Sequence, residues 1–384
     1  MKFSIVAGFL LLLTYLSLFC FAHSSFAIYN PLARANNYHG IHILFPSELQ
    51  QAASLVNSKE GEWGYVTIPI QAGDKDLKKW QDFMDAAKKL KLIPIIRLST
   101  EGDYFNTATW RIPTDADVLD FANFLNSLDW PLQNRYVIIF NEMNRFDEWG
   151  GESPSPEAYA DILDYAIDAF KSKSTDFYII MGGLDNASPN DGVKYLDNLV
   201  YLRRILKHNP ALFNKLDGFA SHSYPNPDFS RAPSSTAIEG VATYKYEYEI
   251  INSATSHEIP AFITETGWNS TKLGDETVAK YYKETYDTIW GKDIDKIVAI
   301  TPFLLNSQGG QFDTFSFIKN GKETQYFTVA KDEKKVKGEP LLRAVQGIQS
   351  VSMTEIVKKK FVKRGSQFEI PAELLVTQYI KLFF

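Results

Sequence analysis

Cysteine is almost missing from this chain, and its absence excludes two kinds of protein. Cys20 is the only cysteine among the 384 residues, and it lies within an apolar segment near the N-terminus. A mature chain without that segment would have neither a disulfide nor a thiolate nucleophile. The sequence therefore excludes a disulfide-stapled domain and a cysteine protease.

A field of positive charge is also missing. The chain has 40 Lys and Arg against 46 Asp and Glu, which gives a formal net charge of −6. A protein that holds a phosphate backbone needs clustered basic residues, so nucleic acid is not an expected partner. Hydrophobic residues make up 45% of the chain and aromatic residues 14%, which is enough for a large buried core. We expect one sizeable domain or two small ones.

Residues 1–27 are expected to lie outside the folded domain. Lys2 precedes an apolar stretch over residues 5–22, and Ser25 and Ala27 are small residues three and one positions before a cut at Ile28, as in a secretory signal. The stretch also approaches the length of a transmembrane helix, so an uncleaved anchor is the alternative. In both cases we expect the rest of the chain to be secreted or extracytoplasmic, with a membrane contact only if the segment stays uncleaved.

Short apolar runs alternate with longer stretches of helical period after residue 37, without an internal repeat or a low-complexity tract. This alternation is typical of βα units around a parallel sheet, whose strands are covered on both faces. We predict eight strands, at residues 39–44, 64–70, 93–98, 136–140, 177–181, 218–221, 261–264 and 297–304. Helices are predicted at residues 47–57, 76–91, 115–128, 156–172, 191–207, 236–255, 275–290 and 339–350.

Eight strand and helix pairs favour a (β/α)₈ TIM barrel over an open doubly wound sheet. The open sheet would need a glycine-rich phosphate-binding sequence after its first strand, but Phe45-Pro46-Ser47 stand there instead. We therefore predict an α/β barrel domain over residues 36–350.

Two segments exceed the standard unit. Asn320-Gly321 separates two runs of β type, residues 314–318 and 324–329, and predicts a hairpin-like insertion after strand eight, at the barrel mouth. Residues 351–384 form a C-terminal extension with a basic patch around Lys358 to Arg364 and an apolar end. This extension is expected either to pack on the barrel exterior or to act as a surface-binding segment.

Polar residues follow several of the predicted strands at their carboxyl ends, where the loops of a barrel meet at one open face. The candidate site residues are Arg97 near the end of strand three, Asn141 and Glu142 after strand four, His222 and Tyr224 after strand six, and Glu265 and Trp268 after strand seven. Glu142 and Glu265 thus face each other across the predicted mouth. Cleavage of a glycosidic bond needs such a pair, because one carboxyl protonates the leaving oxygen while the other attacks or stabilises the anomeric carbon.

These strings resemble clan A of the retaining glycoside hydrolases. Asn141-Glu142 and Glu265 are similar to the clan's acid/base and nucleophile, and His222-Ser223-Tyr224 is similar to the His-x-Tyr of its cellulase and mannanase-like members. Glu265 to Trp268 is similar to the sequence around the nucleophile of several families, endo-β-1,3-glucanases among them. The resemblance implies a (β/α)₈ barrel in which Glu142 is the acid/base and Glu265 the nucleophile.

Further roles come from the same resemblance. Asn141 is expected to hydrogen-bond the sugar 2-hydroxyl, Tyr224 to hydrogen-bond the nucleophile, and Arg97 to support it electrostatically. His222 and Trp268 are expected to take part in substrate binding. Many clan members have a Trp on strand eight as the floor for the cleaved sugar, but this chain has Pro302-Phe303-Leu304 there, so Phe303 or Phe312 is the candidate replacement.

The sequence therefore predicts a retaining glycoside hydrolase that cleaves a β-linked oligo- or polysaccharide by double displacement, without a cofactor or metal. A metal-dependent barrel hydrolase is one alternative, but its first strand would carry His-x-His, whereas His39 and His42 are three apart and point to opposite faces. An exported, non-catalytic carbohydrate-binding protein on a degenerate hydrolase barrel is the other. Binding alone needs neither carboxylate, so their joint presence argues against it.

Overall fold

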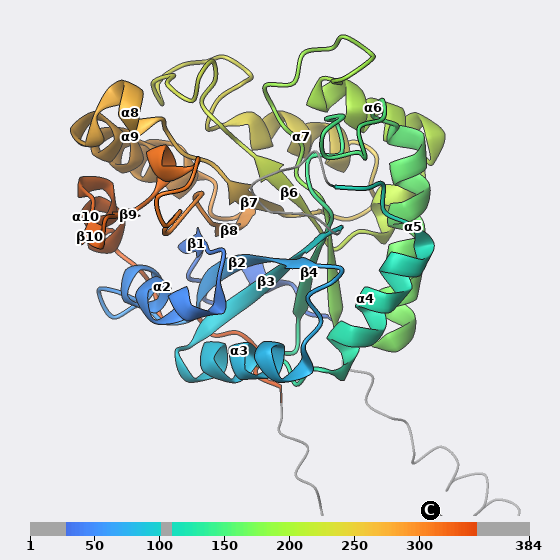
Figure 1. The fold of residues 1–384 in the computed structure, drawn as a ribbon, viewed down its shortest axis with the longest axis horizontal. Coiled ribbons are helices and arrows are strands. Elements are labelled where there is room, and N and C mark those ends of the chain that lie inside the picture. The colour runs from blue at the N-terminus through green and yellow to red at the C-terminus, as the bar shows by residue number, and fades with distance from the viewer. Residues whose placement is uncertain (1–27, 101–109, 344–384) are drawn as a thin grey trace, which may run out of the picture. The chain divides into compact units, whose positions relative to one another are not determined.

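The computed structural model describes residues 28–100 and 110–343. Within them, eight parallel strands form one sheet in the order β1 to β8, each paired with the next along the chain. β8 returns to β1 through a parallel bridge between His39 and Ile300, and His42 N donates to Pro302 O at 3.0 Å. The sheet is therefore a barrel, as Figure 1 shows, and the predicted (β/α)₈ TIM barrel is confirmed.

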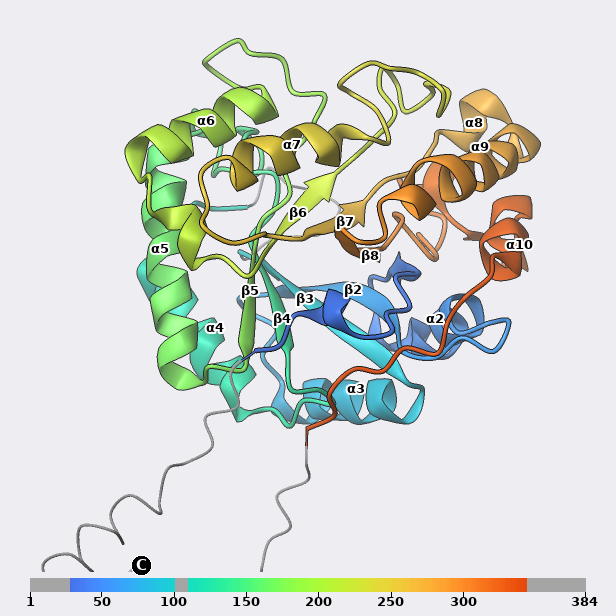
Figure 2. The same ribbon diagram turned by 180° about the vertical axis from the view of Figure 1, so that it is seen from behind.

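Each predicted apolar run overlaps one strand of this barrel. The strands are β1 Gly40–His42, β2 Gly64–Gln71, β3 Leu92–Ser99, β4 Arg135–Ile139, β5 Phe177–Met181, β6 Gly218–His222, β7 Ala261–Glu265 and β8 Ile297–Ile300. The helices are α2 Leu49–Val56, α3 Leu77–Lys89, α4 Asp115–Ser127, α5 Pro156–Lys173, α6 Asn198–His208, α7 Thr243–Asn252, α8 Ser270–Leu273, α9 Asp275–Thr288 and α10 Gln325–Asp332. The views from front and back show the helices on the outside of the strands (Figures 1 and 2).

Side-chain caps fix where several helices begin. The side chains of Asp76, Thr114 and Ser155 each accept a hydrogen bond from a backbone N–H in the first turn of α3, α4 and α5. Thr114 also forms a capping box with Asp117, and Pro156 occupies the first position of α5, where its missing N–H costs nothing. These caps explain why the predicted starts of the three helices are accurate.

The strand pleat divides the core into an inner and an outer layer. Tyr65, Tyr136, Tyr178 and Phe262 point into the barrel, where the rings of Tyr136 and Tyr178 lie 4.9 Å apart between centroids. The residues between them, such as Val137, pack outward beneath the helices. Aromatic rings therefore fill the barrel interior, and the polar strand ends are left for the open face.

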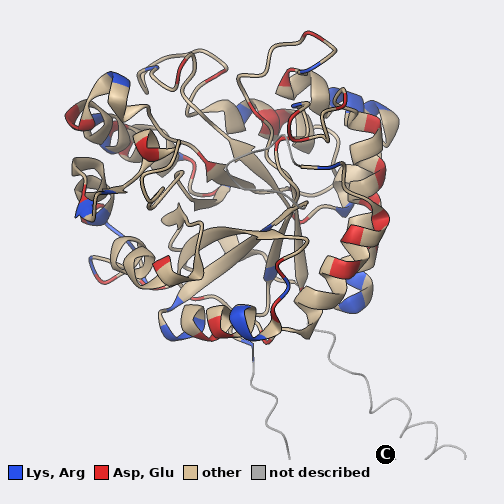
Figure 3. Cartoon of the chain, viewed as in Figure 1, with Lys and Arg blue, Asp and Glu red and all other residues tan. Residues whose placement is uncertain are grey.

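Charged side chains lie mainly on the outer helices and on loops, and the strands are nearly free of them (Figure 3). None of the described helices combines the length and the apolar composition that crossing a membrane requires. The segment 1–27, expected to be a signal or an anchor, and the extension 351–384 lie outside the described residues.

The region after β8 differs from the prediction. A hairpin is present, but its strands are only two residues long, β9 Ile318–Lys319 and β10 Lys322–Glu323, joined by Asn320 and Gly321 at φ 50° and 72°. The second run predicted as a strand is wrong, because it forms α10. Thr324 caps this helix by accepting from Phe327 N at 3.2 Å, and Tyr326, Phe327 and Ala330 are buried at helical spacing.

Three further helix predictions differ from the structure. Residues 339–343 are not helical, so the helix predicted at 339–350 is wrong over the part that is described; α10 packs against α9 and α2 in its place. α6 and α7 each begin seven residues, about two turns, later than predicted, at Asn198 and Thr243. The residues before these later starts belong to the loops after β5 and β6, which are therefore longer than predicted.

Candidate active site

A cavity of about 1360 Å³ opens at the carboxyl ends of the strands. Five of the seven predicted site residues line it: Arg97, Asn141, Glu142, Tyr224 and Glu265. His222 lies between the two glutamates but is 99% buried, so its contacts are with them rather than with the cavity space. Trp268 lies away from the cavity.

The end of β4 turns Glu142 toward this cavity. Phe140 and Glu142 both have left-handed backbones, with φ 64° and 38°. Such a conformation costs a non-glycine residue free energy and persists where the surroundings hold it. Glu142 N donates to Gly183 O at 2.9 Å, which anchors the turn to the segment after β5.

A β-bulge determines the direction of Glu265. Ser221 pairs with Ile263, but the next residue of β6, His222, pairs with Glu265, so β7 holds one extra residue at Thr264. Strict alternation from the inward-facing Phe262 would place Thr264 inward and Glu265 outward. The bulge reverses this and brings Glu265 to the same side as His222.

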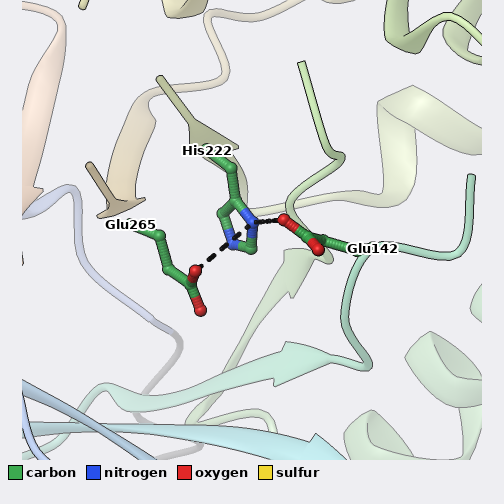
Figure 4. Close-up of side chains that lie close together, drawn as sticks. All are labelled: Glu142, His222 and Glu265. Carbon is green, nitrogen blue, oxygen red and sulfur yellow. Dashed lines mark hydrogen bonds and ion pairs between the residues drawn. The ribbon is translucent and has the colours of Figure 1, made fainter. Parts of the chain in front are cut away.

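His222 connects the two carboxylates, as Figure 4 shows. Its Nδ1 lies 2.8 Å from Glu142 Oε1 and 3.9 Å from Glu265 Oε2. Burial alone would lower the pKa of His222, but the carboxylates of Glu265 and Glu142 outweigh it and raise the pKa above the ordinary value. The ring fits because residue 183 is glycine: a Cβ there would lie 2.3 Å from the ring.

Positive charge and hydrogen bonds hold Glu265 in its ionised form. Arg97 Nη1 donates to Glu265 Oε1, and Tyr224 Oη donates to Oε2 at 3.0 Å. Burial would raise the pKa of Glu265, but His222 and Arg97 and the Tyr224 hydrogen bond together lower it to about 2. Glu265 is therefore an anion at any ordinary working pH.

Arg97 also orients Asn141. The same Nη1 donates to Asn141 Oδ1 at 2.9 Å, so the amide oxygen is occupied and the amide N–H₂ group is the part that can serve a ligand. The role of Asn141 beside a sugar hydroxyl stays a prediction.

The cavity has an aromatic wall and a charged wall. Phe303, Phe312 and Phe315 lie on the aromatic side, and the rings of Phe303 and Phe312 are 5.1 Å apart between centroids. Both predicted replacements for the strand-eight Trp thus line the cavity. The charged side comes from Arg145 and Asp147 on the loop after β4 and from Asp185. Glu148, on the same loop, also lines the cavity.

The residues of this charged wall were not predicted. Arg145 Nη1 lies 3.7 Å from Glu142 Oε2 and 3.2 Å from Asp185 Oδ2, so it contacts the predicted acid/base directly. The only signal in the sequence is that Arg145 follows Glu142 by three positions, which does not bring side chains together outside a helix.

The prediction that Trp268 binds substrate is corrected by its position. Trp268 is 1% exposed, packs on Tyr281 and Tyr282, and donates from Nε1 to Arg231 O at 2.9 Å. It supports the loop that carries Arg231 into the cavity and leaves no ring face for a sugar. Trp110 is the tryptophan that lines the cavity.

One group of residues in the described part of the chain has the spacing of a metal site. The donor atoms of Glu142, His222 and Glu265 all lie within 4.8 Å of one another. However, the Arg97 guanidinium is hydrogen-bonded to Glu265, and His222 Nδ1 already contacts Glu142. A fixed cation at this point competes with a metal ion for the same carboxylate.

Comparisons with known proteins agree with this geometry. A protein-family model described as cellulase, glycosyl hydrolase family 5, matches residues 54–298, more than half of the chain. No curated protein sequence matched significantly.

Several solved structures share the fold. A monomeric β-xylosidase from Caulobacter crescentus CB15 has 14% identity and a TM-score of 0.56, over 81% of this chain and 71% of that one. A subfamily 18 member of glycoside hydrolase family 5 from Streptomyces cattleya, in complex with GlcNAc, has 13% identity and a TM-score of 0.56, over 80% and 83%. An endo-β-1,3-glucanase of family 128 from Pseudomonas viridiflava has 11% identity and a TM-score of 0.51, over 79% and 100%. At these identities the likeness concerns the fold.

Proposed function

Because this chain belongs to glycosyl hydrolase family 5, within clan A of the glycoside hydrolases, we propose that it cleaves a β-linked oligo- or polysaccharide by a retaining double displacement. Membership of the family makes the protein a glycosidase, and the predicted resemblance to clan A is confirmed. The retaining course, the β-linkage and the roles of single residues are the parts that we add.

The separation of the two carboxyl groups carries this proposal. An oxygen of Glu142 and an oxygen of Glu265 lie within 4.8 Å of each other across the cavity. Retaining glycosidases hold their two carboxyl groups about 5–5.5 Å apart, whereas inverting enzymes need about 6.5–9.5 Å to admit a water molecule. The short separation supports direct attack by one carboxylate on the anomeric carbon.

Glu265 is the nucleophile in this scheme. Its low pKa keeps it ionised, and Arg97 and Tyr224 fix both oxygens so that the carboxylate is oriented before substrate arrives. Attack forms a glycosyl ester with Glu265, while the C–O bond to the leaving sugar breaks.

Glu142 is the acid and then the base. In its protonated form it gives its proton to the departing glycosidic oxygen. It then takes a proton from a water molecule. This water attacks the anomeric carbon from the side that the leaving sugar has vacated, and the bond to Glu265 breaks. His222, in contact with both carboxylates, holds them at the separation that the two steps share.

The cavity supports a substrate longer than one sugar. Its volume of about 1360 Å³ exceeds the roughly 300–1,000 Å³ that small-molecule sites usually have. Aromatic side chains on one wall suit the apolar faces of sugar rings, and polar side chains on the other suit their hydroxyls.

Replacement of the nucleophile tests the proposal. Glu265→Gln keeps the shape of the side chain but cannot form the ester, so hydrolysis of aryl β-glycosides should fall by roughly 10⁴-fold or more, while oligosaccharide binding measured by calorimetry survives. Glu157→Gln, an exchange on the outer helix α5, is the matched control and should keep full activity. If the wild-type protein binds glycans but cleaves none of a broad panel, the alternative of a non-catalytic carbohydrate-binding protein is correct.

A further inference from the structure

The cavity contains a third buried carboxyl group, which the double displacement does not use. Glu148 lies on the loop after β4 and lines the cavity together with Glu142, Arg97 and Trp110. It is 7% exposed, and its Oε2 has no hydrogen-bond partner among the described residues. A buried polar oxygen without a partner lowers the stability of a fold, so its presence in a cavity points to a ligand.

The nearby cations are already engaged by other acids. Arg145 donates from Nε and Nη2 to Asp147, at 3.0 and 2.8 Å, and from Nη1 to Asp185 at 3.2 Å. Arg97 is bonded to Glu265 and Asn141. Neither guanidinium forms an ion pair with Glu148 within the part of the chain that the structure describes.

Burial favours the protonated form of the Glu148 carboxyl group. Burial raises the pKa of Glu148 well above its ordinary value, and the Glu142 carboxylate raises it further, while Arg145 and Arg97 only partly oppose this. A neutral carboxyl group has one O–H to donate and oxygen lone pairs to accept. A sugar hydroxyl can satisfy both.

We propose that Glu148 is a substrate-binding residue that hydrogen-bonds a hydroxyl group of the sugar lying beside Glu142. This inference rests on the proposed glycosidase function and assigns one specific contact within that site. Because Glu148 Oε2 has no partner among the described residues, Glu148 should favour a sugar that carries a hydroxyl group at this point. The deoxy analogue would leave that buried oxygen unpaired.

Two exchanges at this position separate binding from folding. Glu148→Leu removes both hydrogen-bonding atoms and also removes a buried polar group that has no protein partner. We expect the KM, or the Kd from calorimetry, to rise roughly ten- to hundredfold, while the thermal midpoint stays level or rises. Glu148→Gln retains a donor and an acceptor of the same shape and should stay within about threefold of the wild-type affinity.

Glu247 offers the matched control. It is also a buried glutamate with an oxygen that has no partner among the described residues, but it does not line the cavity, and its Oε1 accepts from Asn198 Nδ2 at 2.8 Å. Glu247→Leu leaves Asn198 without that acceptor, so it should lower the thermal midpoint and leave KM unchanged. The two leucine variants thus predict opposite patterns of stability and affinity.

The probes are the p-nitrophenyl β-glucoside, β-mannoside and β-xyloside for hydrolysis, and cellohexaose and laminarihexaose for calorimetric binding. If Glu148→Leu binds the preferred probe as the wild type does, the role of Glu148 is refuted, and the glycosidase function stands. If the wild type cleaves no probe but binds an oligosaccharide, the proposed function fails, and the loss of binding in Glu148→Leu still supports the contact. A wild-type protein that neither cleaves nor binds any probe overturns both.

Discussion

Three side chains determine the state of Glu265 at the scale of single residues. Arg97 and His222 supply positive charge, and Tyr224 donates a hydrogen bond at 3.0 Å to an oxygen of a group that is 93% buried. Charge-assisted hydrogen bonds are strong in such a site because water does not compete for the carboxylate. The proposed nucleophile is thereby ionised and oriented before a substrate binds.

Removal of the Tyr224 hydroxyl should weaken the nucleophile. In Tyr224→Phe, one oxygen of Glu265 loses its donor, so the pKa of Glu265 rises from its low value and the acid limb of kcat/KM moves to higher pH. We expect kcat to fall roughly ten- to hundredfold. A pH–rate profile measures both effects. Tyr201→Phe, a buried exchange in the outer core layer, is the matched control, and an unshifted acid limb in Tyr224→Phe would contradict the assignment.

The position of His222 depends on a missing side chain at residue 183. A methyl group at Gly183 would meet the imidazole at 2.3 Å, so Gly183→Ala should displace the ring and separate Glu142 from its partner. We expect kcat to fall by roughly a hundredfold, because small displacements of reacting groups are costly. Gly73→Ala meets nothing within 4 Å and should keep full activity, which a steady-state assay of both variants checks. Equal activity of the two variants would show that the ring does not set the geometry.

At the scale of elements, the positions of the strands could be predicted from the sequence, but the direction of the side chains at the strand ends could not. Fully buried runs such as residues 177–181 identify a strand because both faces are apolar. The bulge at Thr264 leaves no pattern in the sequence, yet it alone directs Glu265 inward. Glu265 was found from its motif, and strict alternation would have placed it on the wrong side.

In the segment after β8, the local sequence pattern predicted a strand where the structure has a helix. Asn320-Gly321 correctly predicted a turn, but the residues after it satisfy both a strand and a helix pattern over a short length. Thr324 settles the choice, because its side chain caps the backbone of α10. Tertiary packing against α9 and α2 then stabilises the helix.

The aromatic wall of the cavity includes Phe303, which follows β8. Phe303 lines the cavity, and its ring lies 5.0 Å from that of His42 and 5.1 Å from that of Phe312, between centroids. If it supports the sugar ring, Phe303→Ala should lower kcat/KM for aryl β-glycosides roughly ten- to a hundredfold, whereas Phe303→Trp should retain most of it. Steady-state kinetics with both variants checks this, and equal losses in the two would exclude a stacking role.

At the scale of the whole molecule, the barrel explains how distant parts of the sequence form one site. Glu142 and Glu265 are 123 positions apart in the sequence (265 − 142), and strands β4 and β7 bring their oxygens within 4.8 Å. Strand order was enough to predict that they face one cavity. Arg145, Asp185 and Glu148 were not predicted, because they lie on long loops whose sequence has no regular period.

The stereochemical course of hydrolysis tests the central claim most directly. Proton NMR of the anomeric signals, recorded while the enzyme cleaves its preferred aryl β-glycoside, identifies the first product. The short separation of Glu142 and Glu265 predicts that the β-hemiacetal forms first and that the α-anomer grows later by mutarotation. If the α-hemiacetal forms first, the enzyme inverts, and the assignment of Glu265 as a nucleophile is wrong.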